Sequence, residues 1–192
     1  MSFLQILRHS SVRSWARIVA GCCVFLPSLS AENPRSVTEE QLRPVLIFQV
    51  AQYVNWSDTK AKPGEALRFC VLDNSDLANA LTLIVRGKSI QDRPVSVFNA
   101  RSVADLSGCN VAFIGISRAK SLSELFAHWV YPPMLVVGEA QGFAELGGMI
   151  NLKVTTGKIG LQVNVANVER AGLKVRSQLL QLAQLVSSSG VK

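Results

Sequence analysis

The segment Leu67-Arg-Phe-Cys-Val-Leu72, with Asp73-Asn-Ser-Asp76 directly after it, decides the fold class. All but one of the residues in the first segment are apolar, which is typical of a parallel strand that is covered on both faces of its sheet. The second segment contains residue types that cap helix N-termini, so we expect a helix from Ser75 to about Ile84. A buried strand that leads into a helix is the repeating unit of α/β proteins.

The same alternation continues along the chain. Before the first strand, the capping box Thr38–Gln41 predicts a helix over residues 42–54. A further helix is expected from Ser117, or from the box Ser121–Glu124, to about Trp129. Further strands are expected at Pro94–Phe98, Val111–Ile116 and Met134–Val137. We therefore predict an α/β fold, a single domain with a mostly parallel sheet that helices flank on both faces.

A hairpin and two helices are expected at the C-terminal end. Ile150–Val165 alternates apolar and polar residues on both sides of Thr156-Gly157, which predicts an antiparallel hairpin. Asn167 is expected to cap a short helix, and Ser177–Val186 has the period of a last helix. Two leucines of that last helix are expected in the core, Leu179 and Leu182.

The first 31 residues have the composition of a secretory signal peptide. Three arginines precede the uncharged apolar run Ile18–Leu26, and small residues follow up to Ala31. These are the three parts of such a signal, and the run is shorter than the roughly 20 residues that span a membrane. We predict that residues 1–31 are cleaved and that residues 32–192 form the mature domain in the periplasm.

Val19–Cys22 offers an alternative, because it resembles the site at which bacterial lipoproteins are cut and acylated on cysteine. Only Ile18 to Gly21 would then remain as the apolar segment after Arg17. So short a run cannot supply the hydrophobic core that a signal peptide needs.

The net charge and the cysteine count indicate which class of partner and which covalent link to expect. Removing the signal peptide leaves 17 basic and 13 acidic residues, a net charge of +4 that is scattered along the chain, so no nucleic-acid partner is expected. Cys70 and Cys109 are the two cysteines that remain. An even pair in an oxidising compartment is most simply a disulfide, worth roughly 4 kcal/mol on the chain-entropy model. Two free buried thiols are the alternative.

No catalytic or metal-binding motif is found in the chain. Serine-hydrolase chemistry needs a histidine base, and His128, the sole histidine of the mature sequence, stands among apolar residues. A zinc site is not expected either, because the chain has one mature histidine and no Cys-x-x-Cys spacing. The glycines of residues 138–148 lack the spacing of a phosphate-binding loop. Asp73–Asp76 lacks the twelve-residue loop of a calcium site, and a turn with a helix cap explains it. We therefore expect neither an enzyme nor a cofactor.

Several motifs together resemble the YfiR-like family of small periplasmic proteins. The resemblance extends from about residue 40 to residue 186. It rests on Gln52–Trp56, Phe69–Leu72, Gly108–Ile114, Met134–Ile150, Ala171–Leu173 and Ser177–Ala183. The two mature cysteines coincide with a pair that members of this family join as a disulfide.

This resemblance implies a regulatory role. The type member is a repressor that binds the periplasmic sensor domain of an inner-membrane diguanylate cyclase, and an outer-membrane lipoprotein sequesters it under envelope stress. The expected output is control of cyclic-di-GMP and biofilm formation. The type member looks to carry a second disulfide in its Gly-rich segment, whereas Gly142–Leu152 contains no cysteine here. Redox switching through such a second bridge is therefore not expected.

The partner-binding surface is predicted near the hairpin, where an edge strand and surplus apolar residues are expected together. We expect four residues to border it, Ile150, Gln162, Val168 and Val186. The alternative is that these residues pack inside the domain or in a homodimer. A different functional class, a small-ligand-binding or accessory module of another envelope receptor, would use Trp56 or the loop 138–148 near a pocket, although core packing explains Trp56 alone.

Export can be tested at the N-terminus of the mature protein. We expect N-terminal sequencing to find Ala31 or Glu32 first, and osmotic shock to release the protein in soluble form, because a cleaved signal leaves no membrane anchor. Recovery from membranes with an acylated Cys22 would instead support the lipoprotein alternative.

Overall fold

The computed structural model describes residues 38–56, 64–115, 122–127, 132–155 and 158–188, all within one folded unit. The predicted signal peptide lies outside these residues, as do His128 and the hairpin turn Thr156-Gly157. Among the residues that are described, no helix has the length and apolar character needed to cross a membrane.

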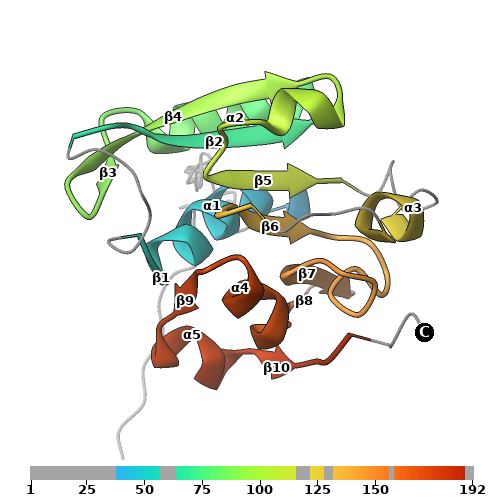
Figure 1. The fold of residues 1–192 in the computed structure, drawn as a ribbon. Coiled ribbons are helices and arrows are strands. Elements are labelled where there is room, and N and C mark those ends of the chain that lie inside the picture. The colour runs from blue at the N-terminus through green and yellow to red at the C-terminus, as the bar shows by residue number, and fades with distance from the viewer. Residues whose placement is uncertain (1–37, 57–63, 116–121, 128–131, 156–157, 189–192) are drawn as a thin grey trace, which may run out of the picture. The chain divides into compact units, whose positions relative to one another are not determined.

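An eight-stranded sheet forms the body of the domain (Figure 1). The β7–β8 and β3–β4 pairs are antiparallel and the other neighbours are parallel. This confirms the predicted α/β class with a mostly parallel sheet. In spatial order the strands are β10 (Gln184–Leu185), β8 (Lys158–Val163), β7 (Ile150–Thr155), β6 (Leu135–Gly138), β5 (Val111–Ile114), β2 (Leu67–Leu72), β4 (Arg93–Ala100) and β3 (Ser89–Ile90).

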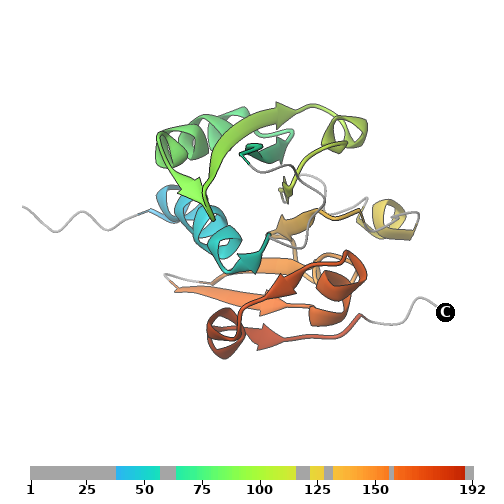
Figure 2. The same ribbon diagram turned by 60° about the vertical axis from the view of Figure 1, so that its left-hand side comes forward.

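The chain order places helices on both faces of the sheet. From β2 the chain passes through α2 (Ser75–Val85) to β4, and it then crosses back over β2 through the 3-10 helix η1 (Val103–Leu106) to β5. The next crossover, through α3 (Leu122–Ala127), continues away from β2 to β6. Right-handed crossovers in opposite directions lie on opposite faces. Figure 2 shows this arrangement, with α1 (Glu39–Gln52) and α2 on one side of these strands and η1 and α3 on the other.

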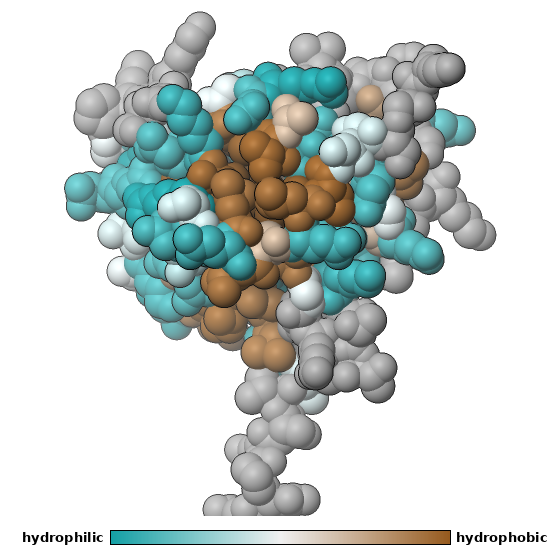
Figure 3. Space-filling model, turned by 90° about the horizontal axis from the view of Figure 1, so that it is seen from below, coloured by the Kyte–Doolittle hydropathy of each residue, from teal (hydrophilic) through white to brown (hydrophobic). Residues whose placement is uncertain are grey.

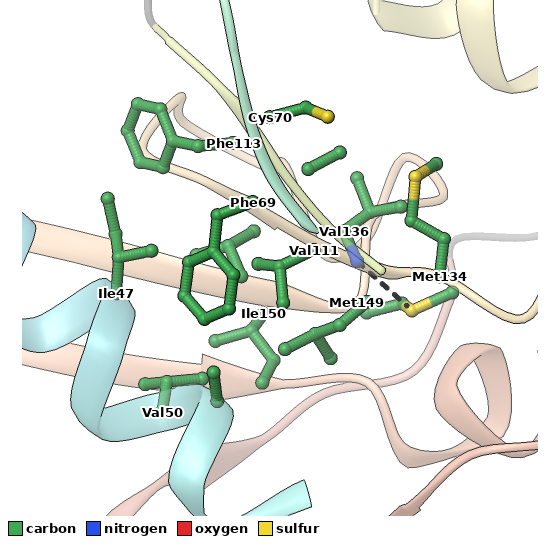
Figure 4. Close-up of a cluster of buried hydrophobic side chains, with 14 of the residues drawn as sticks. Ile47, Val50, Phe69, Cys70, Val111, Phe113, Met134, Val136, Met149 and Ile150 are labelled. Carbon is green, nitrogen blue, oxygen red and sulfur yellow. Dashed lines mark hydrogen bonds between the residues drawn. The ribbon is translucent and has the colours of Figure 1, made fainter. Parts of the chain in front are cut away.

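One part of the core lies between α1 and the centre of the sheet. Ile47 and Val50 of α1 point toward Phe69 of β2 and Ile150 of β7 (Figure 4), and all four side chains are buried. Cys70, the next residue of β2, points to the opposite face of the sheet. Full burial of one side chain of this size stabilises the fold by roughly 1.5–3 kcal/mol, so the apolar stripe of α1 and the two strands hold each other in place.

The structure joins Cys70 to Cys109 in a disulfide, with the two Cα atoms 6.0 Å apart. This distance lies within the roughly 7 Å that a disulfide allows. Cys109 precedes β5, so the bridge closes a loop that contains α2, β4 and η1. Beside it, the backbone N–H of Asn110 donates to the carbonyl oxygen of Arg68 at 2.8 Å. The disulfide therefore ties the crossover that passes over β2 to β2 itself.

The C-terminal end differs from the sequence-based expectation. The helix α4 (Val165–Arg170) is capped by Asn164 and not by Asn167. The helix α5 (Ser177–Leu182) is shorter than expected, because the chain then turns to pair β10 with the outer edge of β8. That pairing satisfies backbone groups of an edge strand, and it leaves Leu182 76% exposed, so the placement of Leu182 in the core was wrong. Leu179 is buried, as predicted.

A second, two-stranded sheet was not predicted at all. It pairs β1 (Val54–Asn55) with β9 (Lys174–Val175), in antiparallel orientation. Strands of two residues are too short to produce an alternating pattern, and the apolar period predicts Val54 as the end of the preceding helix.

The disulfide should dominate the response of this domain to reduction. We expect Cys70→Ser to lower the free energy of unfolding by roughly 2–5 kcal/mol, measured by urea denaturation of the mature protein. Without the bridge, which joins residues separated by 39 positions, the unfolded chain gains conformational entropy. Cys109→Ser and the double variant should give the same loss, since all three remove one bridge. Two titratable thiols in the unreduced wild type would contradict the pairing.

Candidate functional site

The β7–β8 hairpin presents two different faces. Leu152 of β7 lies opposite Leu161 of β8, and Asn151 lies opposite Gln162, because side chains alternate along each strand. The leucine pair faces the same groove as α1. On the other face, Asn151 is 2% exposed and Gln162 is 7% exposed. Polar side chains that the sequence pattern would place toward solvent are thus covered by protein.

On the leucine face the hairpin borders an apolar groove of about 330 Å³. Figure 3, which views the molecule from below Figure 1, shows a hydrophobic patch surrounded by hydrophilic residues on this side. Leu182, at the end of α5, is the most exposed of the large hydrophobic side chains in the lining. The groove is lined by Leu46, Gln49, Val50, Tyr53, Leu152, Gly160, Leu161, Leu179 and Leu182.

The Gly-rich connection between β6 and β7 covers the polar face of the hairpin. Phe143, at its centre, is fully buried, and its ring packs edge-on against Phe126 with the centroids 5.5 Å apart. A Cβ atom on Gly138 or Gly148 would overlap the ring of Phe143. The glycines of this connection therefore make room for an aromatic side chain, which explains their abundance without a phosphate-binding role.

Two buried amides fasten this connection to α4. Nδ2 of Asn164 donates to the carbonyl oxygen of Ala144 at 2.8 Å, and Nδ2 of Asn167 donates to that of Gly148 at 2.9 Å. Both asparagines are fully buried. The sequence marked Asn167 only as a helix cap, since nothing in its local pattern indicates contacts with residues about 20 positions earlier.

Under the connection lies a polar cavity of about 610 Å³. Nδ2 of Asn151 donates to Oε1 of Gln162 at 2.9 Å, and Nε2 of Gln162 lies 3.5 Å from Oε1 of Glu145. Glu139, at the carboxyl end of β6, forms an ion pair with Arg43 of α1, with Oε2 and Nε 2.7 Å apart. The cavity is lined by Glu139, Ala140, Gln141, Gly142, Glu145, Asn151, Lys153 and Gln162.

A further cavity, of about 480 Å³, borders the disulfide. Cys109 lines it, but its sulfur is bonded to Cys70 and offers no thiol for chemistry. Nearby, the backbone N–H groups of Ser102 and Arg101 donate to Asp105 and hold the pKa of its carboxyl below the usual value. These bonds cap η1, so this carboxylate has a structural role. Among the described residues, no group of three metal-ligating side chains is found.

The four predicted partner-binding residues do not share one surface. Ile150 and Val168 are buried in the core, with Val168 only 1% exposed, so in this fold neither can contact a partner. For these two, the alternative of internal packing holds. Gln162 lines the polar cavity, and Val186 is half-buried with its backbone N–H bonded to the carbonyl oxygen of Val163 at 3.0 Å. Trp56 is buried too, and its Nε1 donates to the carbonyl oxygen of Ala51 at 2.8 Å.

The comparison with protein families agrees with this architecture. Residues 40–184 match the model of the YfiR/HmsC-like family, which spans more than half of the chain and extends from α1 into β10. The chain belongs to the YfiR/HmsC-like family. This confirms the resemblance noted in the sequence. At the level of the family, YfiR/HmsC-like proteins are periplasmic regulators of cyclic-di-GMP signalling.

The buried amides of α4 should matter for stability. We expect Asn167→Ala to lower the free energy of unfolding by about 1–3 kcal/mol, because it leaves the buried carbonyl of Gly148 without a donor. Urea denaturation gives the measurement. Asn99→Ala, which truncates an exposed asparagine of β4, is the matched control and should change stability by less than about 0.5 kcal/mol. Equal effects of the two substitutions would contradict the assigned role.

Proposed function

We propose that this protein is a periplasmic negative regulator. It binds the periplasmic sensor domain of an inner-membrane diguanylate cyclase through the apolar groove, and it thereby represses cyclic-di-GMP synthesis. The family supports the signalling context. The observation that carries the proposal is the apolar groove between α1, the hairpin and α5, with Leu182 76% exposed at its border.

The exposed side chain of Leu182 leaves apolar surface in contact with water in the free monomer. Burial of that surface in a complex would contribute to the binding free energy. Burial of apolar surface contributes about 25 cal/mol per Å², and binding energy concentrates in a few desolvated anchors within a polar rim. Gln49 in the groove and the exposed Gln178 and Gln181 of α5 supply neutral polar groups near it. These features support recognition of an apolar element of the partner, with little dependence on charge.

The remaining parts of the proposal concern export and release. Residues 1–31 direct the chain across the inner membrane and are cleaved, so that residues 32–192 act in the periplasm. An outer-membrane lipoprotein relieves repression by sequestering the regulator, as the family resemblance implies. A second copy of the chain is the competing occupant of the groove.

The groove can be tested by charge substitution at Leu182, its exposed leucine. We expect both Leu182→Asp and Leu182→Arg to weaken binding to the isolated sensor domain at least tenfold, a loss of about 1.4 kcal/mol or more, because either charge must be desolvated in the interface. Cellular cyclic-di-GMP should rise at unchanged protein level. Titration calorimetry and a cyclic-di-GMP assay provide the two readouts.

Leu83→Asp is the matched control. Leu83 is 65% exposed on α2 and does not line the groove, so its substitution should leave binding unchanged. Circular dichroism verifies that each variant is folded. Wild-type affinity in both folded Leu182 variants would remove the groove from the proposal. A change of oligomeric state with normal repression would assign the groove to a homodimer instead.

A further inference from the structure

The lining of the polar cavity contains three buried acceptor atoms that have no hydrogen-bond donor among the described residues. One of them, Oε2 of Glu139, is balanced by the ion pair with Arg43. The other two are Oε2 of Glu145 and Oδ1 of Asn151, and the remaining polar atoms of these two side chains are engaged. Asn151 is 2% exposed. A buried acceptor without a donor costs roughly 1–3 kcal/mol, and more for a charged group. By contrast, the neighbouring buried amides of Asn164 and Asn167 both donate to backbone carbonyl groups.

The size of the cavity indicates an organic ligand. Its volume of about 610 Å³ is far larger than the roughly 30 Å³ of one water molecule. It falls within the roughly 300–1,000 Å³ that is usual for small-molecule sites. The cavity also lies at the carboxyl end of the parallel strand β6, the edge at which α/β sheets bind ligands.

The unsatisfied acceptors of the lining indicate a ligand with N–H donors. Glu139 is already paired with Arg43, whereas the contact described for the carboxylate of Glu145 is with the neutral amide of Gln162. An ammonium group could donate to Oε2 of Glu145 and to Oδ1 of Asn151 together. A divalent metal ion fits less well, because calcium takes six to eight oxygen ligands.

We propose that the polar cavity is a binding site for a small organic amine. The protonated nitrogen of the ligand donates to Glu145 and Asn151 beneath the Gly-rich connection, and Lys153, whose side chain is exposed, opposes it by charge. This site lies on the other face of the hairpin from the groove. The proposed amine site can therefore be tested independently of the proposed regulatory function.

The test is titration calorimetry of the mature wild-type protein with methylammonium and putrescine. Tetramethylammonium has the same charge as methylammonium but no N–H donor, and calcium has charge without a donor. We expect saturable binding of the first two probes and none of the last two. No binding of either amine up to about 10 mM would overturn the proposal. A dissociation constant above that concentration corresponds to a binding free energy weaker than about 3 kcal/mol. Equal binding of tetramethylammonium, or preferential binding of calcium, would overturn it as well.

Three variants locate the site. Glu145→Gln keeps the shape of the side chain and removes its charge, and it should weaken putrescine binding at least tenfold. Lys153→Ala removes a like charge and should strengthen binding severalfold, so it remains informative if Glu145→Gln does not fold. Glu169→Gln, an exposed carboxylate of α4 outside the cavity, is the matched control and should change nothing. Wild-type affinity in the folded Glu145 or Lys153 variants would place the amine elsewhere and overturn the proposal.

Discussion

Partial burial of both faces of the β7–β8 hairpin is the constraint on which the candidate sites depend. A hairpin at the side of a sheet ordinarily exposes one face, and its polar residues then need no protein partners. Here one face carries Leu152 and Leu161 against α1, and the other carries Asn151 and Gln162 beneath the Gly-rich connection. Each covered polar side chain must therefore find a hydrogen-bond partner inside the protein, or leave an acceptor available for a ligand.

The Gly-rich connection can cover that polar face because it is fastened by packing and by amides. Phe143 fills the space that the absent side chains of Gly138 and Gly148 leave open. Asn164 and Asn167 then hold the carbonyl groups of the connection from α4. Amide hydrogen bonds of this kind respond neither to reductants nor to pH near neutrality, whereas the Cys70–Cys109 bridge lies in another part of the sheet and ties β5 to β2. Among the described residues, the response to reductants therefore lies at the crossover over β2.

The groove and the polar cavity share the same two strands. Leu161 lines the groove and its neighbour Gln162 lines the cavity, and Leu152 and Asn151 have the same relation on β7. Close-packed interiors transmit small displacements, because neighbouring side chains have no free space to absorb them. A displacement of β8 would therefore alter the lining of the groove and of the polar cavity together.

The sequence by itself determined the α/β class, the main parallel strands, the hairpin and the family, because each depends on local periodicity, capping residues and motif order. It also singled out the cysteine pair, since two cysteines leave one intramolecular pairing. Tertiary structure alone decided which side chains of the C-terminal part are buried and which are exposed. Val168 and Ile150 are apolar in the same way as Leu182, yet the first two are buried and Leu182 is exposed. The physical reason is that β10 leaves the expected helix to pair with the edge of β8, and such long-range pairing leaves no trace in the local pattern of side chains.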